Sequence, residues 1–180
     1  MINKHNLKRR DVLKKITLTS LGLPLTEKFK INQVYNYKIL NEMNRKGNIN
    51  HSVCKWCYDN ISLEEFAINV KLMGITGIDL IGPDQWPILK KYNLNSSMCN
   101  GAEISLTEGW NDKQYHGVLV NKYLNHIDLV AAAGYQNLIC FSGNRRNIDN
   151  ETGMNNCVEG LKKILGHAEK KGVMIQMELL

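Results

Sequence analysis

The sequence predicts an α/β fold in which helices cover a parallel sheet. From residue 49 onward, short apolar segments typical of strands alternate with longer segments whose apolar residues recur every three or four positions, as in amphipathic helices. Glycine or asparagine closes each predicted helix. Strict strand–helix alternation leaves two common arrangements, an open doubly wound sheet or a barrel. In both, the functional site lies at the C-terminal ends of the strands.

The basic charge of the chain is concentrated at its N-terminus. The overall charge is +6, of which residues 1–50 contribute +8 and residues 51–180 contribute −2. A basic leader is more typical of a targeting segment or a solvated tail than of a nucleic-acid surface, so we expect no nucleic-acid partner. No apolar run reaches the roughly 18 residues of a membrane-spanning helix, so we expect no stable membrane insertion.

The first 25 residues resemble a twin-arginine export signal. Arg9 and Arg10 form the pair, an apolar pair follows, and a weakly apolar stretch completes the order that such signals have. We therefore expect a periplasmic or secreted protein, with a cytoplasmic one as the alternative. Residues 26–48 are rich in Asn and Lys, and we interpret them as a polar linker.

Five strands and four helices are expected between residue 49 and the end of the chain. The first helix opens with Ser62 and Glu65, which form a capping box. The second holds Pro87 in its first turn, where proline is tolerated. The predicted strands are residues 49–55, 77–81, 96–99, 137–141 and 173–177. The predicted helices are residues 62–74, 84–93, 113–133 and 151–171.

The five cysteines do not form the even, regularly spaced set of a disulfide framework, and we expect most of them to be buried thiols. Cys54 and Cys57 have the spacing of a redox or zinc pair, but no second pair completes a zinc site. A strand that extends through Lys55 would turn the two thiols to opposite faces. A redox protein is therefore the least favoured of the functions considered.

Glu178 is the main candidate for chemistry. In the last predicted strand, Val173, Ile175 and Met177 alternate with Met174, Gln176 and Glu178. One set is expected to face the helices and the other the opposite side of the sheet, with Glu178 at the C-terminal rim. A carboxylate there is costly to bury unless it is paired or binds a metal. The alternative is a solvent-exposed glutamate at a frayed strand end.

Five segments of the chain form a recognisable set. They are NHSVCKWCY at 50–58, IDLIGP at 78–83, MCNG at 98–101, AAGYQNLICFSGNR at 132–145 and MELL at 177–180. Together they resemble the hydroxypyruvate isomerase-like proteins of the xylose isomerase-like TIM-barrel superfamily. The resemblance covers about residues 47–180.

The resemblance implies a (β/α)8 barrel that holds one divalent metal ion, Mg²⁺ or Mn²⁺, at its C-terminal rim. It also implies an isomerase or epimerase that interconverts hydroxy-aldehydes and hydroxy-ketones or epimerises ketoses. Glu178 matches a glutamate that is both a metal ligand and one of two acid/base carboxylates. Asn100 and Asn144 match loop positions that could line the pocket of a small sugar substrate, and Trp56 could form an apolar wall.

The chain departs from this family in its extent. The resemblance implies that the other ligands, an Asp, a His or Gln and a second Glu, come from strands six to eight. We therefore expect residues 49–180 to be a TIM barrel truncated after strand 5, inactive as an isolated chain and prone to self-association through exposed sheet edges. The alternative function is a non-catalytic sugar-binding module.

Overall fold

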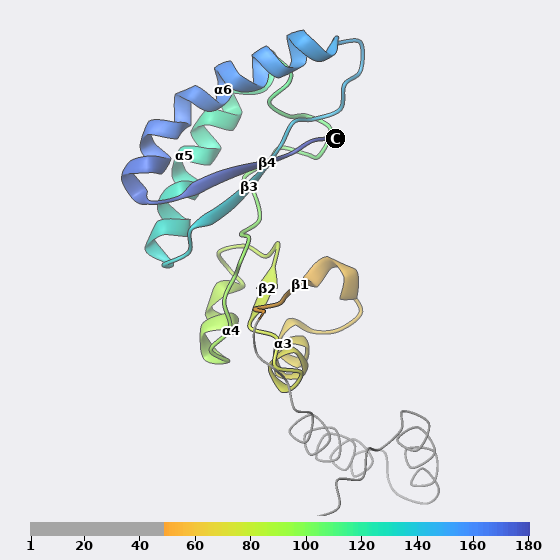
Figure 1. Ribbon diagram of the computed structural model, residues 1–180, viewed down its shortest axis with the longest axis vertical. Helices are drawn as coiled ribbons and strands as arrows, with labels where there is room; N and C mark the ends of the chain where they lie inside the picture. The colour runs from red at the N-terminus through yellow and green to blue at the C-terminus, as the bar shows by residue number, and fades with distance from the viewer. Residues whose placement is uncertain (1–48) are drawn as a thin grey trace, which may run out of the picture. The chain divides into compact units, whose positions relative to one another are not determined.

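The computed structural model describes residues 49–180, and the predicted export signal and linker lie outside the described residues. Figure 1 shows an α/β arrangement in which strands alternate with helices. The strands are β1 (Ser52–Cys54), β2 (Gly77–Asp79), β3 (Asn137–Phe141) and β4 (Met174–Glu178). The α-helices are α3 (Leu63–Leu72), α4 (Trp86–Lys91), α5 (His116–Ala132) and α6 (Asn150–Lys171). Two 3₁₀-helices complete the fold, η1 (Lys55–Tyr58) and η2 (Lys113–Tyr115).

The strands are parallel and follow one another in sequence order. β1 pairs with β2, and β3 pairs with β4. Residues 95–100 lie between the two pairs, because Asn95 forms a parallel bridge with Gly77 and Cys99 forms one with Leu138. A doubly wound sheet reverses its strand order at a switch point, whereas the strands of a barrel follow in sequence. The order observed in residues 49–180 is that of consecutive barrel strands.

The third predicted strand is not regular, and in this respect the prediction is wrong. Oδ1 of Asp79 accepts the backbone N–H of Ser97 at 2.7 Å and that of Met98 at 2.9 Å. These two amides are bound to a side chain, so the backbone ladder with β2 is interrupted where a strand would need it. The segment keeps its place in the sheet and loses only its regular hydrogen-bonding pattern.

The first strand is also shorter than predicted. β1 ends at Cys54, and the chain then turns into η1, which carries Trp56 and Cys57. The expectation that Cys54 and Cys57 lie on one strand and face opposite sides is therefore wrong. Apolar periodicity could not separate a strand from a single 3₁₀ turn over so few residues.

The helix ends agree with the sequence signals. Ser62 caps α3, and its Oγ accepts the backbone N–H of Glu65 at 3.2 Å, which is the serine half of the predicted capping box. Gly172 ends α6 in the left-handed conformation with φ 68°, which glycine adopts without steric cost. The third predicted helix is divided, since η2 precedes α5.

The core lies between the helices and one face of the sheet. Leu138 and Cys140 of β3 are fully buried in the core, which also includes residues of α5 and α6 such as Ile127 and Ile164. Figure 1 shows α5 and α6 covering one face of β3 and β4. Cys99 and Cys157 are also buried, which confirms that most cysteines are packed thiols. Burial raises the pKa of Cys99 to about 11 and that of Cys140 to about 12, so both thiols stay protonated near neutral pH. Among residues 49–180, no helix has the length and apolar character needed to cross a membrane.

Candidate functional site

The register between β3 and β4 determines which way Glu178 points. Residues paired across parallel strands share a face, and Glu178 pairs with Phe141 while Met177 pairs with Cys140. Cys140 belongs to the helix-covered core, so Glu178 lies on the opposite, inner face. Gln176 is on the same inner face, where its Nε2 donates to Oδ1 of Asn137 at 3.0 Å.

The backbone at the end of β4 is held while the Glu178 carboxylate is open to solvent. Ser142 donates its backbone N–H to the carbonyl oxygen of Glu178 at 3.0 Å, which continues the β3–β4 pairing one residue further. The Glu178 side chain is exposed, and no hydrogen bond or ion pair within residues 49–180 engages it. A ligand-binding residue needs a fixed backbone and a side chain that is free to bind, and Glu178 has both.

Groups at the ends of two other strands affect the thiol of Cys54, at the end of β1. Burial raises the pKa of Cys54, and the charges of Asp79, Cys57 and Glu178 raise it further, while Trp56 opposes the shift. Cys54 ends β1, Asp79 ends β2 and Glu178 ends β4. Cys54, at the end of β1, therefore lies within electrostatic range of the carboxylates that end β2 and β4.

The other three predicted residues also follow strand ends. Trp56 lies in η1 with 63% of its surface exposed, and Asn144 is exposed in the loop after β3. Asn100 is half-buried, and its carbonyl oxygen accepts a hydrogen bond from Nε2 of His126 at 3.0 Å. Within residues 49–180, no hydrogen bond joins any two of Trp56, Asn100, Asn144 and Glu178. Each of the four lies at or after the end of a strand or of the strand-like segment 95–100, and their assembly into one site stays a prediction.

A crossing of two loops, which the sequence did not indicate, supports the loop that carries Asn144. The side chain of Asn111 donates to the carbonyl oxygens of Gly143 at 3.1 Å and Asn144 at 2.9 Å. At the crossing, a Cβ on Gly109 would lie 2.3 Å from the nitrogen of Gly143. The loop after residue 100 thus fixes the backbone of Asn144. Only tertiary contacts between distant positions reveal this role.

The described residues do not assemble a metal site. Within residues 49–180, no three His, Cys, Asp or Glu side chains lie close enough to hold a metal ion. Glu178 is one carboxylate, and a catalytic Mg²⁺ or Mn²⁺ wants several oxygen or nitrogen ligands. The donor set described here therefore does not fit the metal that the resemblance implies.

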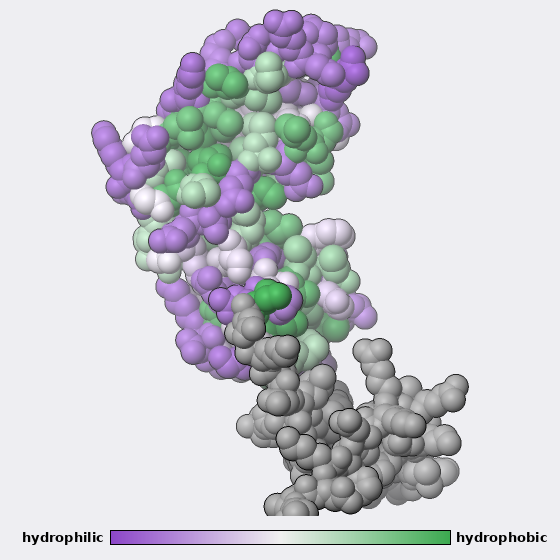
Figure 2. All heavy atoms as spheres, in the orientation of Figure 1, coloured by the Kyte–Doolittle hydropathy of each residue, from purple (hydrophilic) through white to green (hydrophobic). Residues whose placement is uncertain are grey.

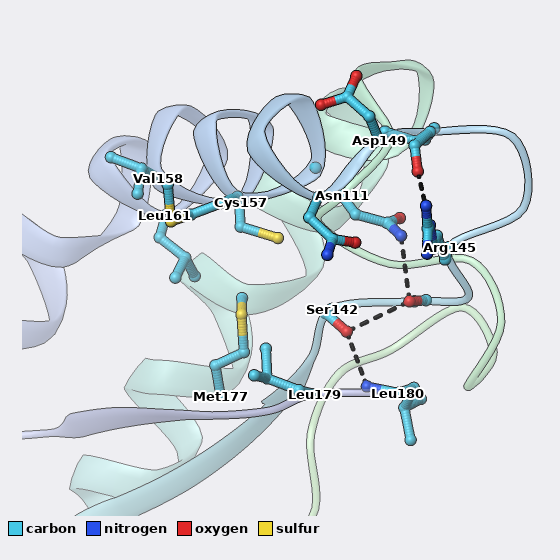
Figure 3. A pocket seen from close by; sticks show the side chains of 15 residues that line it. Asn111, Ser142, Arg145, Asp149, Cys157, Val158, Leu161, Met177, Leu179 and Leu180 are labelled. Carbon is cyan, nitrogen blue, oxygen red and sulfur yellow. Dashed lines mark hydrogen bonds between the residues drawn. The ribbon is translucent and has the colours of Figure 1, made fainter.

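A cavity of about 500 Å³ lies beside the end of β4, where Met177 and Leu179 line it but Glu178 between them does not. Figure 3 shows it between α6 and the end of β4, bordered by Cys157, Leu161, Met177 and Leu179. None of the four predicted site residues lines it. Its nearest cation, Arg145, donates through Nε to the carbonyl oxygen of Ile148 at 3.2 Å. The cavity is mainly apolar and lies on the helix side of the sheet, so we do not assign chemistry to it.

Solved structures with a similar fold include two named as xylose isomerase domain proteins, one from Salmonella typhimurium LT2 and one from Planctomyces limnophilus. A sugar phosphate isomerase/epimerase from Parabacteroides distasonis ATCC 8503 matches with a TM-score of 0.59 and 14% identity, over 75% of this chain and 53% of its own. D-psicose 3-epimerase, solved in the presence of D-fructose, matches with a TM-score of 0.57 and 13% identity, over 73% of this chain and 53% of its own. Mannonate dehydratase from Streptococcus suis serotype 2 matches with a TM-score of 0.53 and 17% identity, over 73% of this chain and 53% of its own.

These similarities show the fold. The chain spans about half the length of the structures it matches, which is consistent with a partial TIM barrel. No protein-family model matches the chain, and no curated protein sequence matches it. The matched proteins include epimerases and a dehydratase, so the fold by itself does not fix the reaction.

Proposed function

We propose that this chain supplies the first strand–helix units of a sugar isomerase or epimerase of the hydroxypyruvate isomerase-like kind. The observation that carries the proposal is the position of Glu178, an unengaged carboxylate on the inner face at the C-terminal end of the last described strand. Barrel enzymes place their catalytic groups at this rim. Several solved structures with the same fold are named as sugar isomerases or epimerases.

The proposed role of Glu178 is proton transfer. Interconversion of a hydroxy-aldehyde and a hydroxy-ketone requires removal of a proton from the carbon next to the carbonyl, and a positioned carboxylate can accept it. Glu178 would also be a ligand of a divalent metal, Mg²⁺ or Mn²⁺, together with groups beyond those described here. Asn100 and Asn144 would bind substrate hydroxyls, and Trp56 would form an apolar wall.

The isolated chain is expected to be inactive. We expect no aldose–ketose interconversion by the 180-residue chain with added Mg²⁺ or Mn²⁺, because one carboxylate does not hold a catalytic metal ion. The measurement is conversion of a panel of small sugars and hydroxypyruvate, followed by proton NMR. The positive control is the chain continued through an eighth strand, which should turn over one of them. Turnover by the 180-residue chain alone would refute the need for further ligands.

A second candidate function is a sugar-binding module that associates with itself. Both edge strands, β1 and β4, lack a partner on one side within residues 49–180. Large apolar side chains such as Met174 and Leu179 are exposed, at 62% and 78%, and Figure 2 shows hydrophobic residues at the surface over β3 and β4. Isothermal titration separates the candidates: metal-independent sugar binding that survives Glu178→Gln favours the module.

We also propose that the protein is exported through its twin-arginine-like leader. The order of the arginine pair and the apolar stretch supports this. Fusing residues 1–48 to a reporter that is active only after export would test it, with Arg9→Lys and Arg10→Lys together as the control. A reporter signal that does not depend on the arginine pair would count against this route.

A further inference from the structure

The structure brings Cys54 and Cys57 into a geometry that the sequence pattern did not predict. Cys54 is the last residue of β1 and the residue that precedes η1, with φ −76° and ψ 127°, and Cys57 is the third residue of η1. The two residues between the cysteines, Lys55 and Trp56, belong to this tight 3₁₀ turn, so the Cα atoms of Cys54 and Cys57 lie about 6 Å apart across it. Disulfides join residues whose Cα atoms lie about 4.4–6.8 Å apart.

The surroundings of the two thiols agree with this geometry. Both are free, Cys57 is exposed and Cys54 is half-buried. After burial and Asp79, the charge of Cys57 is the next cause that raises the pKa of Cys54, which places the two sulfurs within electrostatic range. The remaining cysteines are buried. An oxidant in solution therefore reaches Cys57 first, and the nearest available second thiol is Cys54.

We propose that Cys54 and Cys57 form an intramolecular disulfide when the chain meets a low-molecular-weight disulfide. The Cys57 thiolate attacks one sulfur of the oxidant, which breaks the oxidant's S–S bond and releases one thiolate. The Cys54 thiolate then attacks Sγ of the resulting mixed disulfide and releases the second thiolate. The two cysteines together lose two protons and two electrons, and the oxidant is reduced to two thiols.

The disulfide would change the rim on which the candidate site lies. It would tie η1, which carries Trp56, to the end of β1, and it would remove the thiol of Cys54 from the group that includes Asp79 and Glu178. A closed turn of four residues loses conformational freedom, so the position of Trp56 would become more fixed. The inference does not depend on the proposed sugar chemistry.

Trypsin makes the test direct, because it cuts after Lys55, between the two cysteines. The full native chain is incubated with excess oxidised glutathione, alkylated under denaturing conditions and digested without reductant. We expect peptides 47–55 and 56–71 to be recovered as one disulfide-linked pair, two hydrogen masses below the sum of the reduced peptides. The pair should separate on reduction, and the protein should remain a monomer in non-reducing electrophoresis.

Two variants serve as controls. Cys57→Ser removes an exposed thiol and should abolish the linked pair, whereas Cys157→Ser changes a cysteine elsewhere and should preserve it. The proposal is overturned if both peptides from the oxidised parent are recovered as alkylated thiols or as separate glutathione adducts. It is equally overturned if the linked pair occurs only in a covalent dimer.

Discussion

Replacing Gly109 by alanine is expected to lower the free energy of unfolding by about 3 kcal/mol. A Cβ at this position would lie 2.3 Å from the nitrogen of Gly143 and 2.4 Å from the carbonyl carbon of Ser142. Both atoms are backbone, so neither can rotate away, and the two loops would have to separate. Separation would also break the bonds from Asn111 that fix Asn144. Urea unfolding followed by circular dichroism measures the change.

Gly166 provides the matched control for this substitution. It lies in the interior of α6, and an added Cβ would meet no atom within 4 Å. Since alanine favours a helix over glycine by about 1 kcal/mol, Gly166→Ala should stabilise the protein. The same chemical change should thus have opposite signs at the two positions. Equal urea midpoints for Gly109→Ala and the parent chain would show that the two loops do not cross closely.

Replacing Asp79 by alanine is expected to cost about 3 kcal/mol of the free energy of unfolding. Its Oδ1 accepts two backbone N–H groups, those of Ser97 and Met98, and the residue is only 8% exposed. Alanine would leave both donors in a partly buried place without their acceptor. The loss should appear in the thermal midpoint and should increase hydrogen exchange at these two amides.

Asparagine at the same position separates the hydrogen bonds from the charge. Asp79→Asn keeps an oxygen that can accept both amides, so we expect it to lose less than half as much stability as Asp79→Ala. If the alanine variant stays within about 0.5 kcal/mol of the parent, the amides of residues 97 and 98 do not depend on Asp79.

Periodicity and end signals were enough to predict most of the fold. The alternation of α3, α5 and α6 with β2, β3 and β4 follows from apolar spacing, and Ser62 and Gly172 mark helix ends as local chemistry requires. The irregular third strand could not be predicted, because it depends on a side chain eighteen positions earlier that replaces the backbone partner of Ser97. The turn at η1 could not be predicted either, since four residues are too few for apolar periodicity to distinguish a turn from a strand.

The candidate site was predictable where it depends on strand register. Alternation in the last strand predicted that Gln176 and Glu178 share a face, and the register with β3 shows that this face is opposite the core. The contribution of Asn111 could not be predicted, because its partners are more than thirty positions away. The argument that Cys54 and Cys57 face opposite sides of a strand was wrong for a similar reason, because the chain forms a 3₁₀ turn after Cys54.

The most direct test of the function proposed for Glu178 is proton exchange at the substrate carbon. The chain continued through an eighth strand is incubated with a substrate sugar in deuterium oxide, and deuterium at the carbon next to the carbonyl is measured by NMR. Glu178→Gln should slow exchange by about a hundredfold or more, because the amide cannot accept the proton. Glu169→Gln, which removes an exposed carboxylate from α6, should exchange like the parent. Exchange at the parent rate in Glu178→Gln would contradict the role proposed for this carboxylate.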